Sequence, residues 1–362
     1  MEILLMEHDK YLKKIAPLKP QMPFYVLEYY RSKMTTPLSS ATMYVYFLDF
    51  KRFFEWLIRK KLTNAKTIKE ICFDDLEYLS KKDVEKFVES ERKRLYLQPS
   101  TRNSSIQGHE KTIKRTMEAL KSLFNYLTQE SENELGDPYF QRNVMARIHL
   151  KKVEETLAYR AARISNKLLL GHKTNDFLEF IETNYEKKLS ARAKVSFKQN
   201  KERDLAMLAL VLSSGLRCSE LVGIDLPDIN IEKQTVKVLR KEGKRDAVPF
   251  GKFALPYLNE YIEIREKRYK LGTETSALFI TQYGDSKRIS LGAFNKLVAK
   301  YSEAFEVRVT PHVLRHTLAT RLYSLTNSQV TVSHQLGHSS TAPTDLYTHI
   351  TQNEVQDALK KL

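Results

Sequence analysis

The stretch TPHVLRHTLATRLYSLTNSQVTVSHQLGHSSTAPTDLYTHI, residues 310–350, holds most of the polar groups on which the fold and its chemistry depend. His312 and Arg315 are three residues apart, so on a helix they share one face. His338 directly follows a glycine, and Tyr347 comes nine residues later. An arginine and two histidines can hold a phosphate and a tyrosine can attack one, so this stretch predicts phosphate chemistry.

Apolar spacing within and beyond the stretch predicts three helices, over 311–324, over 328–336, and over a short segment from Pro343 that carries Tyr347. Gly337 would end the second of them. Thr351-Gln352-Asn353-Glu354 resembles a capping box and predicts a last helix through Leu359.

Upstream, the sequence places a second arginine at a corner between helices. A buried helix is predicted to end at Gly215, and Ser219 is predicted to cap a short helix after it. Arg217 lies between these two residues and is flanked by apolar side chains. A buried arginine paired with a carboxylate such as Asp225 would explain the same placement.

A lysine follows in a predicted hairpin. Alternation predicts strands over 234–239 and 247–250, joined by the turn RKEGKRD with its Gly243. Lys241 lies where the first strand meets this turn, although most lysines in such turns simply face solvent. The helices and this hairpin predict a mainly α second half that holds a small antiparallel sheet.

These residue types can divide a phosphoryl transfer between them. Two arginines, Arg217 and Arg315, can neutralise a phosphodiester and its pentavalent transition state. Neutral histidines can donate hydrogen bonds to its oxygens, and Lys241 can protonate a leaving 5′ oxygen. Tyr347 would be a weak nucleophile alone, because the reference pKa of tyrosine is near 10, but cations beside it favour its attack.

Other nuclease chemistries find no support in the sequence. Asp225, Asp228 and Asp246 lie in separate elements, so a two-metal site is not expected. The phosphate-binding pattern GxxxxGK[ST] is absent, so no ATP site of that type is expected. We therefore expect no cofactor and no metal.

The N-terminal half reads as helical. Its only glycines up to residue 170 are Gly108 and Gly136, and helical apolar spacing runs over 39–62, with Trp56 near the apolar seam. Ser80-Lys81-Lys82-Asp83 resembles a capping box, and a further helix has its apolar face over 113–127. Basic residues recur along these helices, which predicts a module that grips the DNA backbone.

Composition gives the class of partner. The 362 residues carry 60 Lys and Arg against 44 Asp and Glu, a formal charge of +16, which favours nucleic acid. The two cysteines belong to no CxxC pair, so neither a cysteine-rich zinc site nor a disulfide framework is expected, and a reducing cytoplasm fits. No apolar run approaches about 18 residues, so we expect no membrane span.

Taken together, five segments resemble the tyrosine recombinase (phage integrase-like) family, and within it the Xer branch that resolves chromosome dimers. They are SGLRCSEL at 214–221, VLRKEGK at 238–244, TPHVLRHTLAT at 310–320, LGHSS at 336–340 and LYTHI at 346–350. The resemblance implies a helical, SAM-like core-binding domain over residues 1–160, a linker over 161–170, and an α-rich catalytic domain with a small β-sheet over 171–362.

The resemblance also implies a site and an activity. Arg217, Lys241, His312, Arg315 and His338 would activate the phosphate, and Tyr347 would attack it to form a 3′-phosphotyrosine. Strands would be cut and rejoined without metal or ATP by a homotetramer on two DNA sites. The last helix would dock on a neighbouring protomer, and a septal DNA translocase is a candidate regulator.

Two departures refine the assignment. The chain has extra N-terminal residues, and residues 183–203 are longer and more basic than in paired Xer proteins; both features resemble the single-recombinase variant of the branch. That variant would resolve chromosome dimers at a dif-like site during cell division. An integrase of a phage or transposon would share the same residues. The sequence also leaves open a non-catalytic DNA-binding relative and a type IB topoisomerase-like enzyme.

Overall fold

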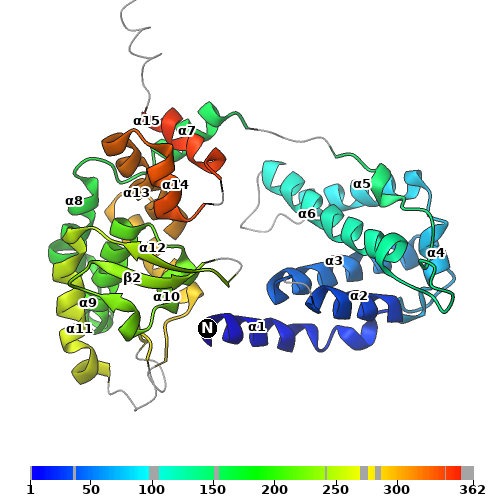
Figure 1. The fold of residues 1–362 in the computed structure, drawn as a ribbon, viewed down its shortest axis with the longest axis horizontal. Coiled ribbons are helices and arrows are strands. Elements are labelled where there is room, and N and C mark those ends of the chain that lie inside the picture. Colours follow the sequence, from blue (N-terminus) through cyan, green and yellow to red (C-terminus); the bar gives the residue numbers. More distant parts are fainter. Residues whose placement is uncertain are drawn as a thin grey trace, which may run out of the picture. The chain divides into compact units, whose positions relative to one another are not determined.

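The structure of this chain, a computed structural model, describes residues 2–35, 38–97, 106–150, 155–240, 243–269, 276–281, 287–338 and 340–351. The chain divides into two compact units, Met1–Glu154 and Glu155–Leu362 (Figure 1). The segment predicted as a linker, residues 161–170, begins inside helix α7 (Leu157–Ser165). α7 belongs to the second unit because it packs against that unit's last described helix, α15 (Asp345–Thr351).

The described residues of the first unit form helices and no strand. The helices are α1 (Glu2–Ile15), α2 (Phe24–Thr35), α3 (Ser40–Arg59), α4 (Phe73–Glu77), α5 (Lys81–Leu97) and α6 (Ile106–Asn125), which continues in a π-helical turn, Tyr126–Glu130. Single 3₁₀ turns cover Lys19–Gln21, Ile68–Glu70 and Met145–Arg147. The predicted helical character of this half is confirmed.

Two helices of this unit begin at serines that the sequence offers as caps, Ser39 or Ser40 for α3 and Ser80 with Asp83 for α5. The Ser39 hydroxyl accepts a hydrogen bond from the Thr42 amide at 3.2 Å at the start of α3. The Asp83 carboxylate accepts from the Ser80 amide at 3.2 Å and from the Ser80 hydroxyl at 2.5 Å at the start of α5. The two amide bonds satisfy donors that the first helical turn leaves unpaired.

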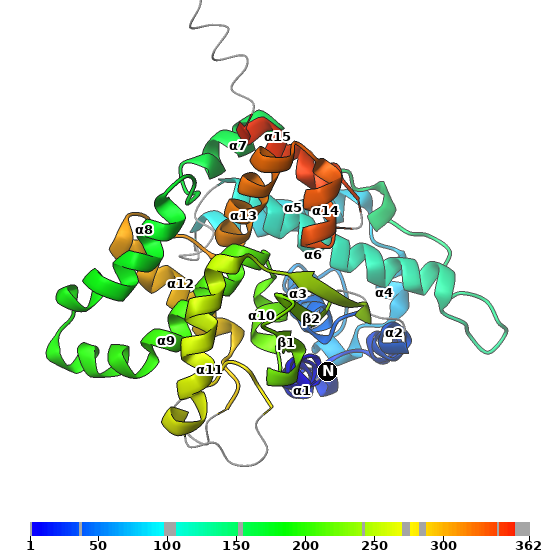
Figure 2. The same cartoon turned by 60° about the vertical axis from the view of Figure 1, so that its left-hand side comes forward.

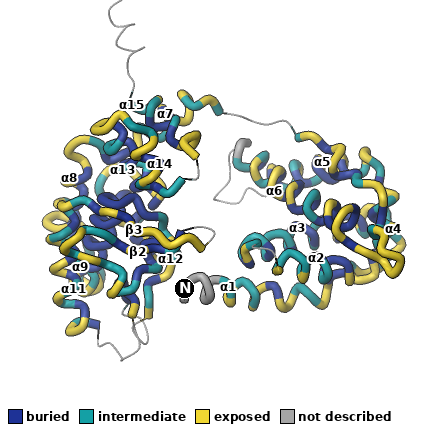
Figure 3. The backbone as a smooth tube through the Cα atoms, in the orientation of Figure 1, coloured by how far each residue is buried: buried dark blue, intermediate teal, exposed yellow. Residues whose placement is uncertain are grey.

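Trp56 belongs to an aromatic core and offers no face for stacking on a base. Its ring lies parallel to that of Phe53 at 6.3 Å between centroids, and edge-on to that of Phe87 at 5.4 Å. Only 1% of Trp56 is exposed. Buried, dark blue stretches alternate with exposed, yellow ones along the helices of this unit (Figure 3). Such offset and edge-to-face pairs add to the free energy that burial of these rings already contributes.

The second unit combines helices with a small sheet (Figure 2). Its helices are α7, α8 (Lys173–Glu179), α9 (Ala191–Ser214), α10 (Cys218–Gly223), α11 (Leu255–Tyr269), α12 (Leu291–Phe305), α13 (Pro311–Thr326), α14 (Gln329–Leu336) and α15. After α8 the chain forms a π-helical turn, Phe180–Asn184, and a 3₁₀ turn, Tyr185–Lys188; other 3₁₀ turns cover Leu226–Asp228, Lys252–Ala254 and Ala342–Thr344. No helix in the described ranges of either unit is long and apolar enough to cross a bilayer.

The sheet has three antiparallel strands in the order β1-β2-β3: β1 (Ile229–Asn230), β2 (Thr235–Leu239) and β3 (Arg245–Pro249). Val236 pairs with Val248, and both are buried on the inner face. Gly243 adopts a φ of +77° in the turn between β2 and β3, a conformation that glycine adopts without strain. The predicted mainly α fold with a small antiparallel sheet is confirmed, and only β1 was not expected.

One basic segment differs from its prediction. The basic residues over 185–204 favour a loop against DNA in the sequence, but the segment forms a 3₁₀ turn and then the first half of α9. The Ser190 hydroxyl accepts the Ala193 amide at 3.4 Å and caps the helix. The segment contains neither glycine nor proline and is rich in Ala, Lys, Arg, Gln and Glu, all strong helix formers, so its charge does not prevent helix formation.

Candidate active site

Arg315 lies at the centre of a cluster of polar groups in the second unit. It belongs to α13, which begins at Pro311, and only 6% of the residue is exposed. Nη1 donates to the Gly215 carbonyl at 2.6 Å, and Nη2 donates to the Leu336 carbonyl at 2.5 Å. These bonds fix the guanidinium between the ends of α9 and α14, which are distant in the sequence.

Arg217 lies just past Gly215, where α9 ends and α10 begins. Gly215 adopts a φ of +69°, and a Cβ there would lie 2.8 Å from a leucine side chain, so the turn requires glycine. Arg217 donates from Nη1 to Glu220 Oε1 at 2.7 Å and from Nη2 to the Gly337 carbonyl at 3.2 Å. Arg217 and Arg315 are therefore both held against the end of α14.

One expectation about this corner is wrong, and one alternative holds with a different carboxylate. The N-cap of α10 is Arg217 and not Ser219, because the Glu220 carboxylate accepts the Arg217 amide at 2.8 Å from within the helix. The carboxylate that pairs with Arg217 is also Glu220, whereas Asp225 pairs with Arg288. A carboxylate three residues after the cap returns to it through one helical turn, which Asp225 cannot do.

The two predicted histidines flank the arginines. His312 lies one turn before Arg315 and makes no side-chain hydrogen bond with any residue that the structure describes; partial burial, Arg315 and Arg217 lower its pKa. His338 Nε2 lies 3.4 Å from Arg315 Nη2. Burial, Arg315, Arg217 and Arg240 lower the pKa of His338 to about 4, so both rings are neutral at pH 7.

Tyr347 lies on α15 with 2% of its surface exposed. Burial raises the pKa of its phenol to about 12, and the positive charge of Arg315 opposes that rise. Its hydroxyl oxygen lies 2.9 Å from Nδ1 of His316, the residue after Arg315. The phenol is thus protonated at neutral pH and lies beside the cation cluster.

Lys241 lies outside the residues that the structure describes. Arg240, which precedes it, is buried and donates from Nη1 to the Leu336 carbonyl at 2.9 Å and from Nη2 to the Gln335 carbonyl at 3.1 Å. Its Nε donates to Asp246 Oδ2 on β3 at 3.0 Å. Arg240 therefore ties the hairpin that carries Lys241 to the end of α14.

Three residues of the cluster were not predicted from the sequence: Glu220, Arg240 and His316. Each of them lies next to a predicted site residue or within one helical turn of it. Their positions in the sequence alone could therefore have marked them as candidates. Their roles depend on contacts across the fold, since Glu220 Oε2 also lies 3.4 Å from Arg240 Nη1. No sequence signal distinguishes such a carboxylate from a helix cap.

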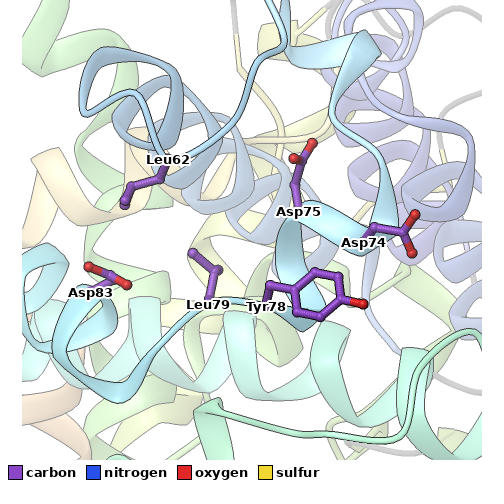
Figure 4. A pocket seen from close by; sticks show the side chains of 6 residues that line it. All are labelled: Leu62, Asp74, Asp75, Tyr78, Leu79 and Asp83. Atoms are coloured by element: carbon purple, nitrogen blue, oxygen red, sulfur yellow. The ribbon is translucent and has the colours of Figure 1, made fainter.

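The pocket drawn in Figure 4 belongs to the first unit and is not part of this cluster. Its volume is about 190 Å³, and it is lined by Leu62, Asp74, Asp75, Tyr78, Leu79 and Asp83. Asp75 Oδ2 accepts from the Thr63 hydroxyl at 2.8 Å and from the Cys72 amide at 3.1 Å, and Asp83 caps α5. Among the described residues, no three His, Cys, Asp or Glu side chains are grouped so as to hold a metal.

Known proteins relate to the chain at three levels. Residues 179–354 match the phage integrase family. The chain is 52% identical to Tyrosine recombinase XerS of Streptococcus gordonii (strain Challis) and to that of Streptococcus mutans serotype c, over 99% of this chain and 100% of each relative. In structure it resembles XerH recombinase bound to a palindromic difH substrate, with a TM-score of 0.62 at 20% identity over 88% of this chain and 78% of that one. It also resembles a lambda integrase dimer bound to a COC′ core site, with a TM-score of 0.54 at 16% identity over 91% and 95%.

The class of protein follows from the full-length relationship: the chain belongs to the tyrosine recombinases, enzymes that cleave and rejoin DNA at specific sites. Within that class it belongs to the Xer branch and is similar over its whole length to the XerS recombinases. The solved structures, below 25% identity, show that the fold is shared.

Proposed function

We propose that Tyr347 is the nucleophile of this recombinase, and that Arg217, His312, Arg315 and His338, together with Lys241, activate the scissile phosphate. The observation that supports this most strongly is the meeting of Arg217 and Arg315 at the end of α14, directly before His338. Two guanidinium groups and a neutral imidazole form a site for an anion with several oxygens.

In the proposed reaction the Tyr347 hydroxyl oxygen attacks phosphorus, and the bond from phosphorus to the 5′ oxygen breaks. The phenol gives its proton to a neutral histidine of the site, Lys241 gives one to the 5′ oxygen, and the phosphate stays joined to the 3′ oxygen as a 3′-phosphotyrosine. Attack by a 5′-hydroxyl reverses the step. The energy of the phosphodiester is kept in the phosphotyrosine, so strand exchange needs no ATP.

The first unit is the proposed core-binding domain and the second unit the catalytic domain. On α6 the basic side chains of Lys111, Lys114 and Arg115 are exposed, one helical face that can follow a phosphate backbone. The segment 352–359, which lies outside the described residues, is the proposed docking helix that reaches a neighbouring protomer. Four protomers on two DNA sites would complete the assembly.

The biological role that we propose is resolution of chromosome dimers at a dif-like site in the cytoplasm during cell division, with a septal DNA translocase as a candidate regulator. Support comes from the full-length similarity to XerS recombinases, and from the XerH structure, whose DNA is a difH substrate. Binding selection on random duplexes, followed by a search of the genome, tests this role. A selected site near the replication terminus supports it, and a site at the end of a mobile element would favour an integrase instead.

Covalent trapping tests the proposed nucleophile. A selected site with a nick beside the scissile phosphate loses the short 5′-hydroxyl fragment, so the phosphotyrosine accumulates and shifts the protein in denaturing gels. We expect an adduct with the wild type and none with Tyr347→Phe, which should bind DNA with unchanged affinity. Tyr323→Phe is the matched control, since Tyr323 is a second buried tyrosine of the same unit and lies on α13. An adduct formed by the Tyr347→Phe variant would exclude Tyr347.

A further inference from the structure

The hydroxyl of Tyr347 has one hydrogen-bond partner among the described residues, and that partner is His316. The two side chains lie 31 residues apart on different helices, α13 and α15, and their oxygen and Nδ1 atoms are 2.9 Å apart. The ring centroids are 5.7 Å apart at an angle of 53°. The contact is therefore made by tertiary packing and not by local sequence.

The direction of this hydrogen bond follows from the chemistry of the two groups. The Tyr347 phenol is buried and protonated, and a buried O–H without a partner is unfavourable, so it needs an acceptor. Burial, with His312, Arg315, Arg160 and His338 around the ring, lowers the pKa of His316 to about 4. The ring is neutral, so Nδ1 accepts the hydrogen bond that the phenol O–H donates, and the ring's own hydrogen is on Nε2.

We propose that His316 is a positioning residue for the recombination reaction, which holds the nucleophilic oxygen of Tyr347 of the same protomer beside the arginine cluster through Nδ1. This inference rests on the proposed role of Tyr347. Because His316 directly follows Arg315, the helix that fixes the phosphate-binding guanidinium also fixes the acceptor for the attacking group. The spacing between nucleophile and phosphate is thereby set by one rigid element.

Loss of this hydrogen bond should slow the attack by Tyr347 and leave DNA binding unchanged. Tyr347 sits on a short helix of seven residues, and its side chain has its own rotamers. Without the Nδ1 bond the phenol would sample orientations in which its oxygen does not face phosphorus, and attack would slow. Binding of DNA would not change, because phosphate contacts come from other groups.

Variants that move or remove the acceptor test the proposal. His316→Asn places an amide oxygen at the position of Nδ1, His316→Gln places it near the position of Nε2, and His316→Leu removes it. On the nicked selected site we expect adduct formation to slow about tenfold in the Leu and Gln variants and less than about threefold in the Asn variant. His349→Leu, at an exposed position of α15, is the matched control and should keep the wild-type rate.

A duplex with sulfur in place of the bridging 5′ oxygen shows whether a variant slows the attack of the tyrosine or the departure of the leaving group. A thiolate leaves without protonation, so this duplex corrects defects in the leaving-group acid only. We expect the deficit of the Leu and Gln variants to persist on it. Correction by sulfur would place His316 on the leaving group and overturn the proposal, as would equal rates for wild type and His316→Leu, or equal losses for Asn and Gln.

The same assays distinguish failure of the proposed nucleophile, Tyr347, from failure of the proposed role of His316. If the wild type forms no adduct, or Tyr347→Phe forms one, the proposed function fails. If the adduct depends on Tyr347 but not on His316, only this inference fails. Should His316→Leu not fold, the comparison of the two amide variants decides, with thermal melting and DNA affinity as checks that each is native.

Discussion

The guanidinium of Arg240 lies directly against the backbone of Gly337. A Cβ built at position 337 would approach Arg240 Cζ to 2.6 Å, and the φ of Gly337 is +61°. Arg240 cannot swing away freely, since the carbonyls of Gln335 and Leu336 and the carboxylate of Asp246 hold it. The glycine before His338 thus leaves room for the arginine before Lys241, and one contact joins two loops of the site.

Replacement of Gly337 by alanine should damage both stability and catalysis. The left-handed backbone and the clash with Arg240 together should lower the free energy of unfolding by about 2–4 kcal/mol, measured by urea denaturation. Adduct formation should slow as His338 is displaced. Gly136→Ala is the matched control, because Gly136 also has a positive φ, +84°, but no atom lies within 4 Å of its added Cβ. A loss at Gly337 no larger than at Gly136 would contradict the crowding argument.

Glu220→Gln should release Arg217. The Glu220 carboxylate is buried and pairs with Arg217 at 2.7 Å and with Arg240 at 3.4 Å, so an amide leaves two guanidinium groups less compensated. We expect a loss of about 2–3 kcal/mol in stability and slower adduct formation. The control is Glu303→Gln, whose exposed partner Arg308 lies 3.8 Å away, and which should change stability by less than about 0.5 kcal/mol.

The stability of the second unit should fall as the pH drops from about 7 towards 4. Burial lowers the pKa of His316 and of His338 from 6.5 to about 4, so between these values the unfolded chain binds protons that the folded chain does not. The stabilisation is fully present above pH 6.5. The urea midpoint of His316→Asn, measured from pH 7.5 to 4.5, should fall less than that of the wild type. Parallel curves would show that His316 titrates normally.

A buried carboxylate should organise the basic face of the first unit. Asp49 is fully buried, pairs with Arg52, and accepts from Arg115 Nη2 and Thr116 Oγ1, both at 3.1 Å. Asp49→Asn should lower stability by about 1–3 kcal/mol and weaken DNA binding, because two arginines lose their anchor.

Glu85→Gln provides the control for that variant. Glu85 faces solvent 3.5 Å from Lys81, and both side chains are more than half exposed. Fluorescence binding curves and urea melts should show little change in this variant. An equal effect of both substitutions on DNA affinity would mean that net charge alone, and not the placement of Arg52 and Arg115, governs binding.

Most elements followed from apolar periodicity and capping residues. The structure contains the capping residues that the sequence offers, Ser39 and Ser80 with Asp83. It also ends α9 and α14 at glycines. The predictions differed from the structure where one local sequence pattern is compatible with two conformations. A basic run over 185–204 reads equally as a loop or as a solvated helix, and Ser219 and Arg217 are both sterically suited to start α10.

The sequence alone determined the residue types, their order, and the helices and hairpin that carry them, because caps, turns and apolar spacing act over a few residues. Tertiary structure alone decided that Arg315 reaches Gly215, that Glu220 lies between Arg217 and Arg240, and that the hydroxyl of Tyr347 meets Nδ1 of His316. Each of these contacts depends on the packing of α9, α13, α14 and α15. Packing is set by the whole core, so no local stretch can encode it.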